Sequence, residues 1–520
     1  MNSKDKRLFN FRPPVLVCLC VMAGVFVANF IVTDNHFKAI SILLIVIVGL
    51  ISLDCQSFFR KLIKSHKVCV FACVIGFLFS LSGIWIGIFK VESRNLDNCE
   101  IIATATITDV SQTYLYVENV CADYYSEDEE VYKTGVKLDG TLRLQISSDD
   151  YVSYNIGENI VFKATVSFNQ AIEDGKINSY YFVYDSLGIG YTTSDDILKT
   201  NTTTNVDTFA FLRKACKDIF DKNMSKDAAG LAYAMIFGDK SDISMIYEDF
   251  RSSGLAHLLA VSGLHVGFFT LLLMFVAKLL RLKNLPKFIF VTTILFLYTW
   301  ICGFSPSILR AFIMSAVAML ATIRGKQYDG LNSLAISAII ILFINPFYLL
   351  DLGFQLRYIS VLFIFMLSPA LTRNLSKFLG KKLASSLAMS IAATVGTLPI
   401  VIQIYPNQSA ISIFTNLIAI PISSIGFMAC IITTIITAIF PFMGFIMVIP
   451  EFAFNILIFI AKSVANMTDA FVTFIPVEVF ISLVVILSVL ISDYIFVKKP
   501  IKQTSAGILC IAFFVMMGIY

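Results

Sequence analysis

Residues 68–89 read VCVFACVIGFLFSLSGIWIGIF, a run of 22 residues without a charged side chain. A helix needs about 20 mostly apolar residues to cross a membrane, so this run predicts a transmembrane helix. Residues 412–440 contain Pro421 and are long for one span, so a broken helix or a re-entrant pair stays open there. Further apolar runs lie at 15–33, 37–53, 254–276, 288–303, 308–323, 332–350, 358–371, 385–405, 412–440, 442–461, 477–497 and 504–520.

The composition agrees with this pattern. Apolar residues make up 57% of the 520 residues and charged residues 15%, whereas soluble domains have about 45–50% and 25%. These values exclude a single soluble globule, and they exclude a disordered chain, which needs low hydrophobicity. The sequence therefore predicts a polytopic α-helical membrane protein with about 12–13 spans.

Charge sets one segment apart from the rest. Residues 90–205 hold 19 acidic and 8 basic residues, a net charge of −11, within a chain whose total is +4. Counting spans places the basic loops on one side of the membrane, which the positive-inside rule assigns to the cytoplasm. We therefore expect a cytoplasmic N-terminus and expect residues 90–253 outside. The basic loops are residues 4–12, 60–67, 278–287, 324–326, 373–382 and 498–502.

The acidic segment has the pattern of a small β-barrel. Apolar and polar residues alternate over stretches of about ten residues, separated by turns such as Asp139-Gly140, which predicts an OB-like barrel insert. Barrels of this kind often bind single-stranded nucleic acid through basic grooves and aromatic stacking, yet the negative charge repels phosphate. A structural or partner-binding barrel stays open, and so does a DNA-contacting barrel that carries a local basic or stacking strip.

Cysteines and the following segment leave alternatives open. Cys99 and Cys121 both fall on the predicted outer side, so they could form a disulfide or remain two free thiols. The eleven cysteines contain no CxxC pair, which disfavours a zinc site. Residues 206–253 are predicted to be amphipathic linker helices on the membrane surface, with a basic guide strip as the alternative.

Polar groups inside predicted spans are functional candidates, because burying them in lipid costs free energy. Two histidines eight residues apart lie about 80° apart on a helix, and two fixed arginines suit a passing anion. Each group could instead join neighbouring helices by hydrogen bonds, and Arg357 could pair with Asp351. The candidates are His257, Ser262, Gly263 and His265 in GLAHLLAVSGLHVG (254–267), Arg310 in SPSILRA (305–311), and Gln355 and Arg357 in DLGFQLR (351–357).

Catalysis has little support in the sequence. A nucleophilic Ser262 would need a nearby base, and none of the four histidines, at 36, 66, 257 and 265, matches a base that faces it from another helix. No HExxH motif and no nucleotide-binding P-loop occur. We therefore expect no catalytic residue, metal or cofactor, and keep an intramembrane serine hydrolase only as an alternative.

Taken in order, these motifs resemble the ComEC family, the inner-membrane channel of bacterial DNA uptake. The N-terminal spans and outer barrel also resemble that family, so the resemblance covers nearly the whole chain. The runs that carry it are AMIFGDKS (234–241), HLLAVSGLHVG (257–267), SPSILRA (305–311), NP (345–346) with GFQL (353–356), TLP (397–399) and NLIAIP (416–421).

The resemblance implies a channel that passes single-stranded DNA through the bacterial cytoplasmic membrane, with the candidate residues along the DNA path. It divides the chain into a three-span region (1–89), the barrel (90–205), linker helices (206–253) and a competence-type channel domain (254–520). It also implies a DNA receptor outside and a cytoplasmic ATPase or helicase. A transporter for another anionic substrate is the main alternative.

The sequence departs from the family at two points. The family pattern FQLS reads FQLR here, so Arg357 adds a cation where a small hydroxyl is expected. Many members also carry a C-terminal metallo-β-lactamase-like domain, and this sequence stops at Tyr520 after its last predicted span. We therefore expect a separate nuclease to be required.

Overall fold

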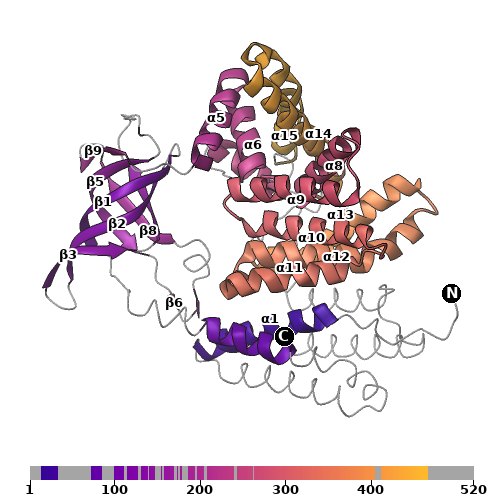
Figure 1. Ribbon diagram of the computed structural model, residues 1–520, viewed down its shortest axis with the longest axis horizontal. Coiled ribbons are helices and arrows are strands. Elements are labelled where there is room, and N and C mark those ends of the chain that lie inside the picture. The colour runs from indigo at the N-terminus through magenta and orange to yellow at the C-terminus, as the bar shows by residue number, and fades with distance from the viewer. Residues whose placement is uncertain are drawn as a thin grey trace.

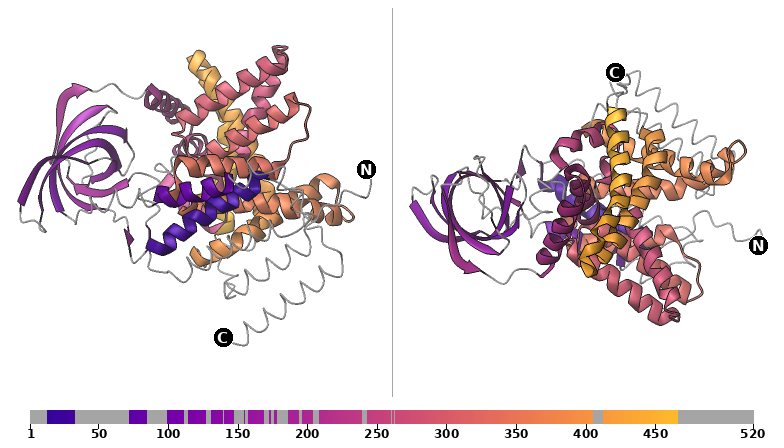
Figure 2. Two further views of the ribbon diagram at one scale, coloured as in Figure 1. Left: turned by 60° about the horizontal axis from the view of Figure 1, so that its bottom comes forward. Right: turned by 90° about the horizontal axis from the view of Figure 1, so that it is seen from above.

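A computed structural model describes residues 13–32, 72–84 and, with short gaps, 99–465. The spans predicted at 37–53, 477–497 and 504–520 lie outside the described residues. Figure 1 shows a β-barrel beside a larger body of helices, and the views in Figure 2 keep the two apart. The described part has five helices long and apolar enough to cross a membrane, together with four shorter apolar helices. The predicted polytopic helical membrane protein with a small barrel insert is confirmed.

Five strands close the barrel. They pair in the order β1-β2-β4-β8-β5, and β5 pairs with β1 to complete the circle. Only the β4–β8 pairing is parallel. Along the chain the circle therefore runs first, second, third, fifth, fourth, as in an OB fold. The five strands are β1 (Cys99–Val110), β2 (Tyr114–Ser126), β4 (Thr141–Ile146), β5 (Glu158–Phe168) and β8 (Ser186–Thr192).

Four further strands extend or accompany the circle. β3 (Val131–Leu138) pairs with β2, and β9 (Ile197–Thr203) pairs with β5. β6 (Ile172–Glu173) and β7 (Lys176–Ile177) form a separate small hairpin.

The barrel has its own core, built by strand alternation. Leu115 and Val117 of β2, Leu142 and Leu144 of β4, and Phe162 of β5 are each at most 2% exposed. Burying a side chain of this size contributes about 1.5–3 kcal/mol. Their neighbours along each strand point outward, so the polar positions predicted from the sequence form the barrel surface.

The register of β1 and β2 decides between the two alternatives left open for Cys99 and Cys121. Cys121 lies opposite Thr104, five residues along β1 from Cys99. At about 3.3 Å per residue this separates the two cysteines by roughly 16 Å, whereas bridged Cα atoms lie within about 7 Å. The two cysteines therefore form no disulfide with each other.

The N-terminal helices run parallel. Cys20 of α1 (Pro13–Val32) packs against Cys73 of the helix Ala72–Ile84. Four residues later, a Cβ on Gly24 would meet the carbonyl oxygen of Phe77 at 2.5 Å. Parallel neighbours need the chain between them to return across the membrane, as the span predicted at 37–53 would do.

The helical body contains two cores. One joins α5, α6, α8, α9, α14 and α15, and the other joins α1, α11, η4 and the start of α12, while α10 contributes side chains to both. Figure 1 shows the two groups at opposite ends of the body. The elements are α5 (Thr208–Asn223), α6 (Lys226–Phe237), α7 (Ser244–Ser252), η3 (Ala256–Leu258), α8 (Gly263–Leu279), α9 (Asn284–Ile301), α10 (Pro306–Ile323), α11 (Gly330–Ile344), η4 (Pro346–Leu350), α12 (Leu352–Leu375), α13 (Lys381–Ile404), α14 (Ser412–Ile439), η5 (Pro441–Met447) and α15 (Val448–Ala465).

The segment predicted as surface linker helices is partly buried. α5 is amphipathic as expected, but every residue of α6 from Ala228 to Ile236 is buried. Glu451 of α15 accepts a hydrogen bond of 2.9 Å from the amide of Ser225 and so caps α6. Tyr298 of α9 donates to the Ile236 carbonyl at 2.7 Å at the other end. α6 therefore belongs to the helical body and not to the membrane surface.

Two predicted spans have different boundaries in the structure. The run predicted at 254–276 is interrupted: η3 ends at Leu258 and α8 begins at Gly263. The run at 412–440 is one helix, α14, which continues through Pro421. The broken helix or re-entrant pair left open there is not formed. Neighbouring helices compensate for the missing amide of a proline inside such a span.

The close approach of β8 to β5 gives a stability test. A Cβ on Gly188 would lie 2.1 Å from the carbonyl oxygen of Ser167 in β5. Because that atom is backbone, Gly188→Ala should destabilise the closed barrel by on the order of 3 kcal/mol. Hydrogen exchange of β5 and β8 amides in the full chain measures this. Gly135→Ala is the control. Nothing lies within 4 Å of its Cβ position, so the left-handed φ of 66° is the strain that alanine adds there, about 1 kcal/mol. An equal loss of protection in both variants would contradict the assignment.

Candidate functional site

The predicted site residues come from three helix beginnings that meet between the two cores. His257 lies in η3, Gly263 and His265 start α8, Arg310 lies in the first turns of α10, and Gln355 and Arg357 lie in the first turns of α12. Ser262 lies outside the described residues. We call the meeting point of Gly263, His265, Arg310, Arg357 and Tyr358 the junction.

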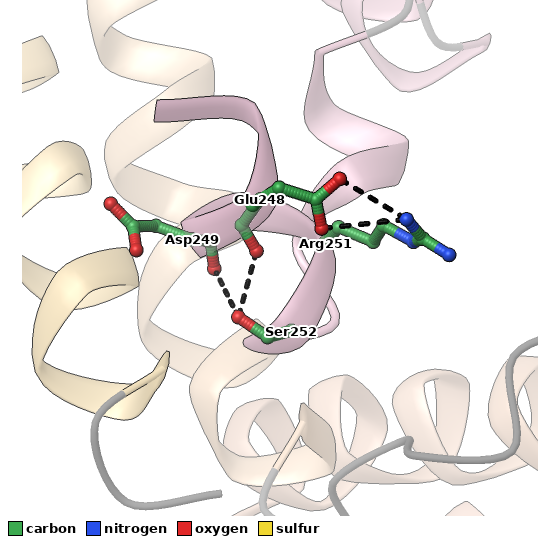
Figure 3. Close-up of polar contacts among 4 residues, drawn as sticks. All are labelled: Glu248, Asp249, Arg251 and Ser252. Atoms are coloured by element: carbon green, nitrogen blue, oxygen red, sulfur yellow. Dashed lines mark hydrogen bonds and ion pairs between the residues drawn. The ribbon is translucent and has the colours of Figure 1, made fainter. Parts of the chain in front are cut away.

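A compact turn leads into this region. At the end of α7 the Ser252 hydroxyl donates to the carbonyls of Glu248, at 2.7 Å, and Asp249, at 3.3 Å. Figure 3 shows Glu248 and Arg251 paired on the outer side of the turn, while the Asp249 carboxylate points away from them. α7 ends in the turn that follows, where Gly254 adopts a φ of 75° and the Leu255 amide donates to the Phe250 carbonyl at 2.8 Å.

His257 is the accessible histidine. Its side chain is exposed, and its Nδ1 lies 3.2 Å from the carbonyl oxygen of Gly254, which adopts a φ of 75°. This contact holds the imidazole against the turn that precedes η3.

Arg310 is the residue of the junction that contacts Gly263, Arg357 and Tyr358. Its side chain is only 5% exposed, and its Nη1 donates to the Arg357 carbonyl of α12 at 2.5 Å. The guanidinium also lies over the Tyr358 ring, with its Cζ 5.5 Å from the centroid. A carbonyl and an aromatic face therefore stabilise a cation that would be costly to bury alone.

The contacts of Arg310 extend to two more helices. A Cβ on Gly263 of α8 would lie 3.0 Å from the Arg310 Nη2, so only glycine lets the guanidinium pass this close. On the far side, the Tyr358 hydroxyl lies 3.1 Å from the Ser337 hydroxyl of α11. One polar relay thus joins α8, α10, α12 and α11.

His265 is buried and packs against an aromatic ring. It has no exposed surface and stacks on Phe427 of α14, with the ring centroids 4.7 Å apart. This contact connects the junction to the core that contains α14 and α15. His265 therefore packs α8 against α14.

The start of α12 is held by its own polar groups. Asp351 accepts a bond of 2.8 Å from the Phe354 amide and caps the helix. Gln355 donates from its side-chain amide to the Leu349 carbonyl at 2.8 Å. Burial raises the pKa of the Asp351 carboxyl, while the Phe354 amide and the Arg357 guanidinium act in the opposite direction. The Gln355 side chain thus links α12 to η4 through a hydrogen bond.

These positions sort the predicted path residues into two groups. Arg310 and His265 are buried in this arrangement, so neither side chain lies on an exposed surface. His257 is exposed, and Gln355 and Arg357 are half-buried. Of the two arginines among the predicted residues, Arg357 is therefore the more exposed.

Sequence reasoning missed the residues that hold Arg310 and His265. Tyr358 lies under Arg310, Ser337 contacts Tyr358, and Phe427 stacks on His265. All three look like ordinary span residues, and their roles depend on which helices meet. In the sequence, these three residues do not stand out from other residues of the spans, such as Asn332 and Asn345. In the part of the chain that the structure describes, no three metal-ligating side chains gather.

Comparison with known proteins identifies relatives. The model of a family described as Competence protein matches residues 235–498, a stretch that includes the whole junction. ComE operon protein 3 of Bacillus subtilis is 28% identical over 211 residues, which are 40% of this chain and 26% of that protein. An uncharacterized protein of Aquifex aeolicus is 27% identical over 143 residues, which are 27% of this chain and 33% of that protein.

The matched stretches therefore span about a quarter and a third of these two relatives. No solved structure matches the chain.

The packing of Arg310 on Gly263 gives opposite expectations for two glycines of α8. Gly263→Ala should destabilise the protein by about 1–3 kcal/mol, because the guanidinium is held by Arg357 and Tyr358 and cannot move aside. Gly267→Ala should stabilise it by about 0.5–1 kcal/mol, because nothing lies within 4 Å of that Cβ position. Thermal unfolding of the detergent-solubilised chain measures both, and a shift of the same sign and size in both variants would contradict the packing.

Proposed function

Because this chain belongs to the competence protein family, we propose that it acts in bacterial DNA uptake by passing one strand of DNA across the cytoplasmic membrane. The proposal concerns a channel and assigns no catalytic step to the chain. DNA uptake is suggested by the family description, and the single strand is suggested by the sequence resemblance.

The observation that carries the proposal is the split of the junction into a buried and an accessible layer. A buried arginine is costly in a membrane protein, so its retention points to something that it must hold in place. Arg310 binds the backbone of Arg357, a residue that is itself only half-buried. A conducting path for a polyanion needs such cations to be fixed but few, because many strong contacts would trap the strand.

The proposed orientation in the membrane rests on the charge pattern of the loops. We propose that the N-terminus is cytoplasmic and that the barrel lies outside, where the strand arrives. The proposed partners are single-stranded DNA and the lipid bilayer, a DNA receptor outside, and a cytoplasmic ATPase or helicase that pulls the strand.

The net charge of −11 on residues 90–205 keeps one alternative in view, a transporter for another anion. An acidic outer domain repels long polyanions at low salt. A photo-crosslinker in place of His257 separates the two functions. Protection by short single strands supports the DNA channel, whereas protection by nucleotides or envelope polymers alone supports the alternative.

Removing the accessible cation should slow DNA entry. We expect Arg357→Gln to reduce internalisation of labelled DNA roughly tenfold, because it removes about one charge contact with the strand. Arg357→Lys keeps the charge and should retain most of the internalisation. Surface-bound DNA should not change, since that step precedes passage. Internalised and surface label are counted separately in cells.

Arg373→Gln is the matched control, because Arg373 lies at the other end of the same helix and is exposed. It should internalise DNA at the normal rate. Normal uptake by Arg357→Gln, with the protein present at its usual level, would contradict the role assigned to the junction.

A further inference from the structure

The outer surface of the barrel carries an ordered group of tyrosines. The register places Tyr114 of β2 beside Gln145 of β4, and Gln145 beside Tyr191 of β8. One step along the strands, Tyr116 lies beside Arg143. Because Leu115 and Leu144 point into the core, these alternate residues point outward. We call Tyr114, Tyr116, Arg143, Gln145 and Tyr191 the tyrosine face.

The members of the tyrosine face are arranged for stacking. Tyr191 is 52% exposed, and Tyr114 and Tyr116 are partly exposed. The Arg143 Cζ lies 5.9 Å from the centre of the Tyr114 ring, so the guanidinium leans over an aromatic face. The row of Tyr114, Gln145 and Tyr191 contains no acidic residue, whereas the register places Asp109 of β1 opposite Tyr116. Glu118 lies one step further along β2, beyond Tyr116, where it accepts a bond from Thr141.

Most of the tyrosine face lies on the two strands that form the binding surface of OB folds. β2 and β4 are the second and third strands of the OB-like circle, and in OB folds this pair forms the surface on which oligonucleotides or oligosaccharides lie. The topology and the side chains were obtained independently, from strand pairing and from residue type. Both select the same surface.

The charge of the segment decides which interaction is available there. Binding by neutralising phosphates requires several lysines or arginines, and residues 90–205 carry a net charge of −11. The tyrosine face itself has one cation, Arg143. Stacking of bases on tyrosine rings does not need positive charge, and it needs bases that are not already paired.

We propose that the tyrosine face binds single-stranded nucleic acid by stacking its bases, with little dependence on salt. The rings hold successive bases while the acidic surroundings keep the remaining phosphates in solution, so the contact is weak and reversible. This deepens the proposed function, on which it rests for the onward path of the strand, because it places a holding surface on the barrel ahead of the junction.

The test is a binding measurement on the full chain in detergent, with a labelled oligothymidine as the probe. The triple variant Tyr114→Ala/Tyr116→Ala/Tyr191→Ala should lose roughly tenfold in affinity or more for each ring engaged. A duplex of the same length and a strand with abasic sites should bind at least tenfold more weakly than the oligothymidine. Affinity should fall only about threefold between about 50 and 200 mM salt, as expected for one phosphate contact.

Lys133→Gln/Lys137→Gln is the control, because it removes two positive charges from β3 without touching the tyrosine face. It should bind like the unmodified chain. Hydrogen exchange of the β2 and β4 amides checks that the triple variant keeps its barrel. Unchanged binding by the folded triple variant, equal binding of the abasic strand, or loss of binding in the lysine variant would each overturn the proposal.

One further variant separates this proposal from the channel. DNA uptake by Arg357→Gln tests the channel, and oligothymidine binding by the folded triple variant tests the tyrosine face. Normal uptake in Arg357→Gln together with lost binding in the triple variant would remove the proposed role of the junction and leave the tyrosine face standing. Reduced uptake in Arg357→Gln together with unchanged binding in the triple variant would show the reverse.

Discussion

The structure depends on how one buried cation is satisfied. Arg310 sits on α10, the helix that contributes to both helical cores, and an unpaired cation there would cost several kcal/mol. The Arg357 carbonyl, the Tyr358 ring and the open surface of Gly263 together make its burial tolerable. Because those three groups lie on two other helices, satisfying Arg310 fixes the relative positions of α8, α10 and α12.

In the proposed channel, a buried cation can still serve a path for anions. There Arg310 does not need to touch the strand, since it orders the first turns of α12 and with them the half-buried Arg357. The proposed role of the barrel uses a different contact. With a net negative charge on residues 90–205, the tyrosine face offers aromatic rings instead of lysines, and in both proposals the contacts are weak enough to release a moving polymer.

Much of the fold could be predicted from the sequence, because its causes are local. Apolar runs located α9, α10, α12 and α13 within a few residues, since hydrophobic length governs membrane spans. Strand alternation gave the barrel. What failed depends on tertiary packing: α6, a short helix of small residues (Ala228–Ile236), is buried because Tyr298 and Glu451 reach it from distant helices. The Cys99–Cys121 pairing failed because strand register cannot be read from two cysteines.

The candidate site could be predicted only in part, because burial within it depends on tertiary packing. The motifs named the helix beginnings that meet, but not which side chains would be buried. The most direct measurement is labelling of single cysteines by a charged, membrane-impermeant thiol reagent, compared with the unsubstituted chain. Cysteine in place of His257 should react, and bound single strands should protect it, whereas cysteine in place of the buried Ala311 beside Arg310 should not react. Reaction at position 311 with none at 257 would contradict the division of the junction into a buried hub and an accessible path.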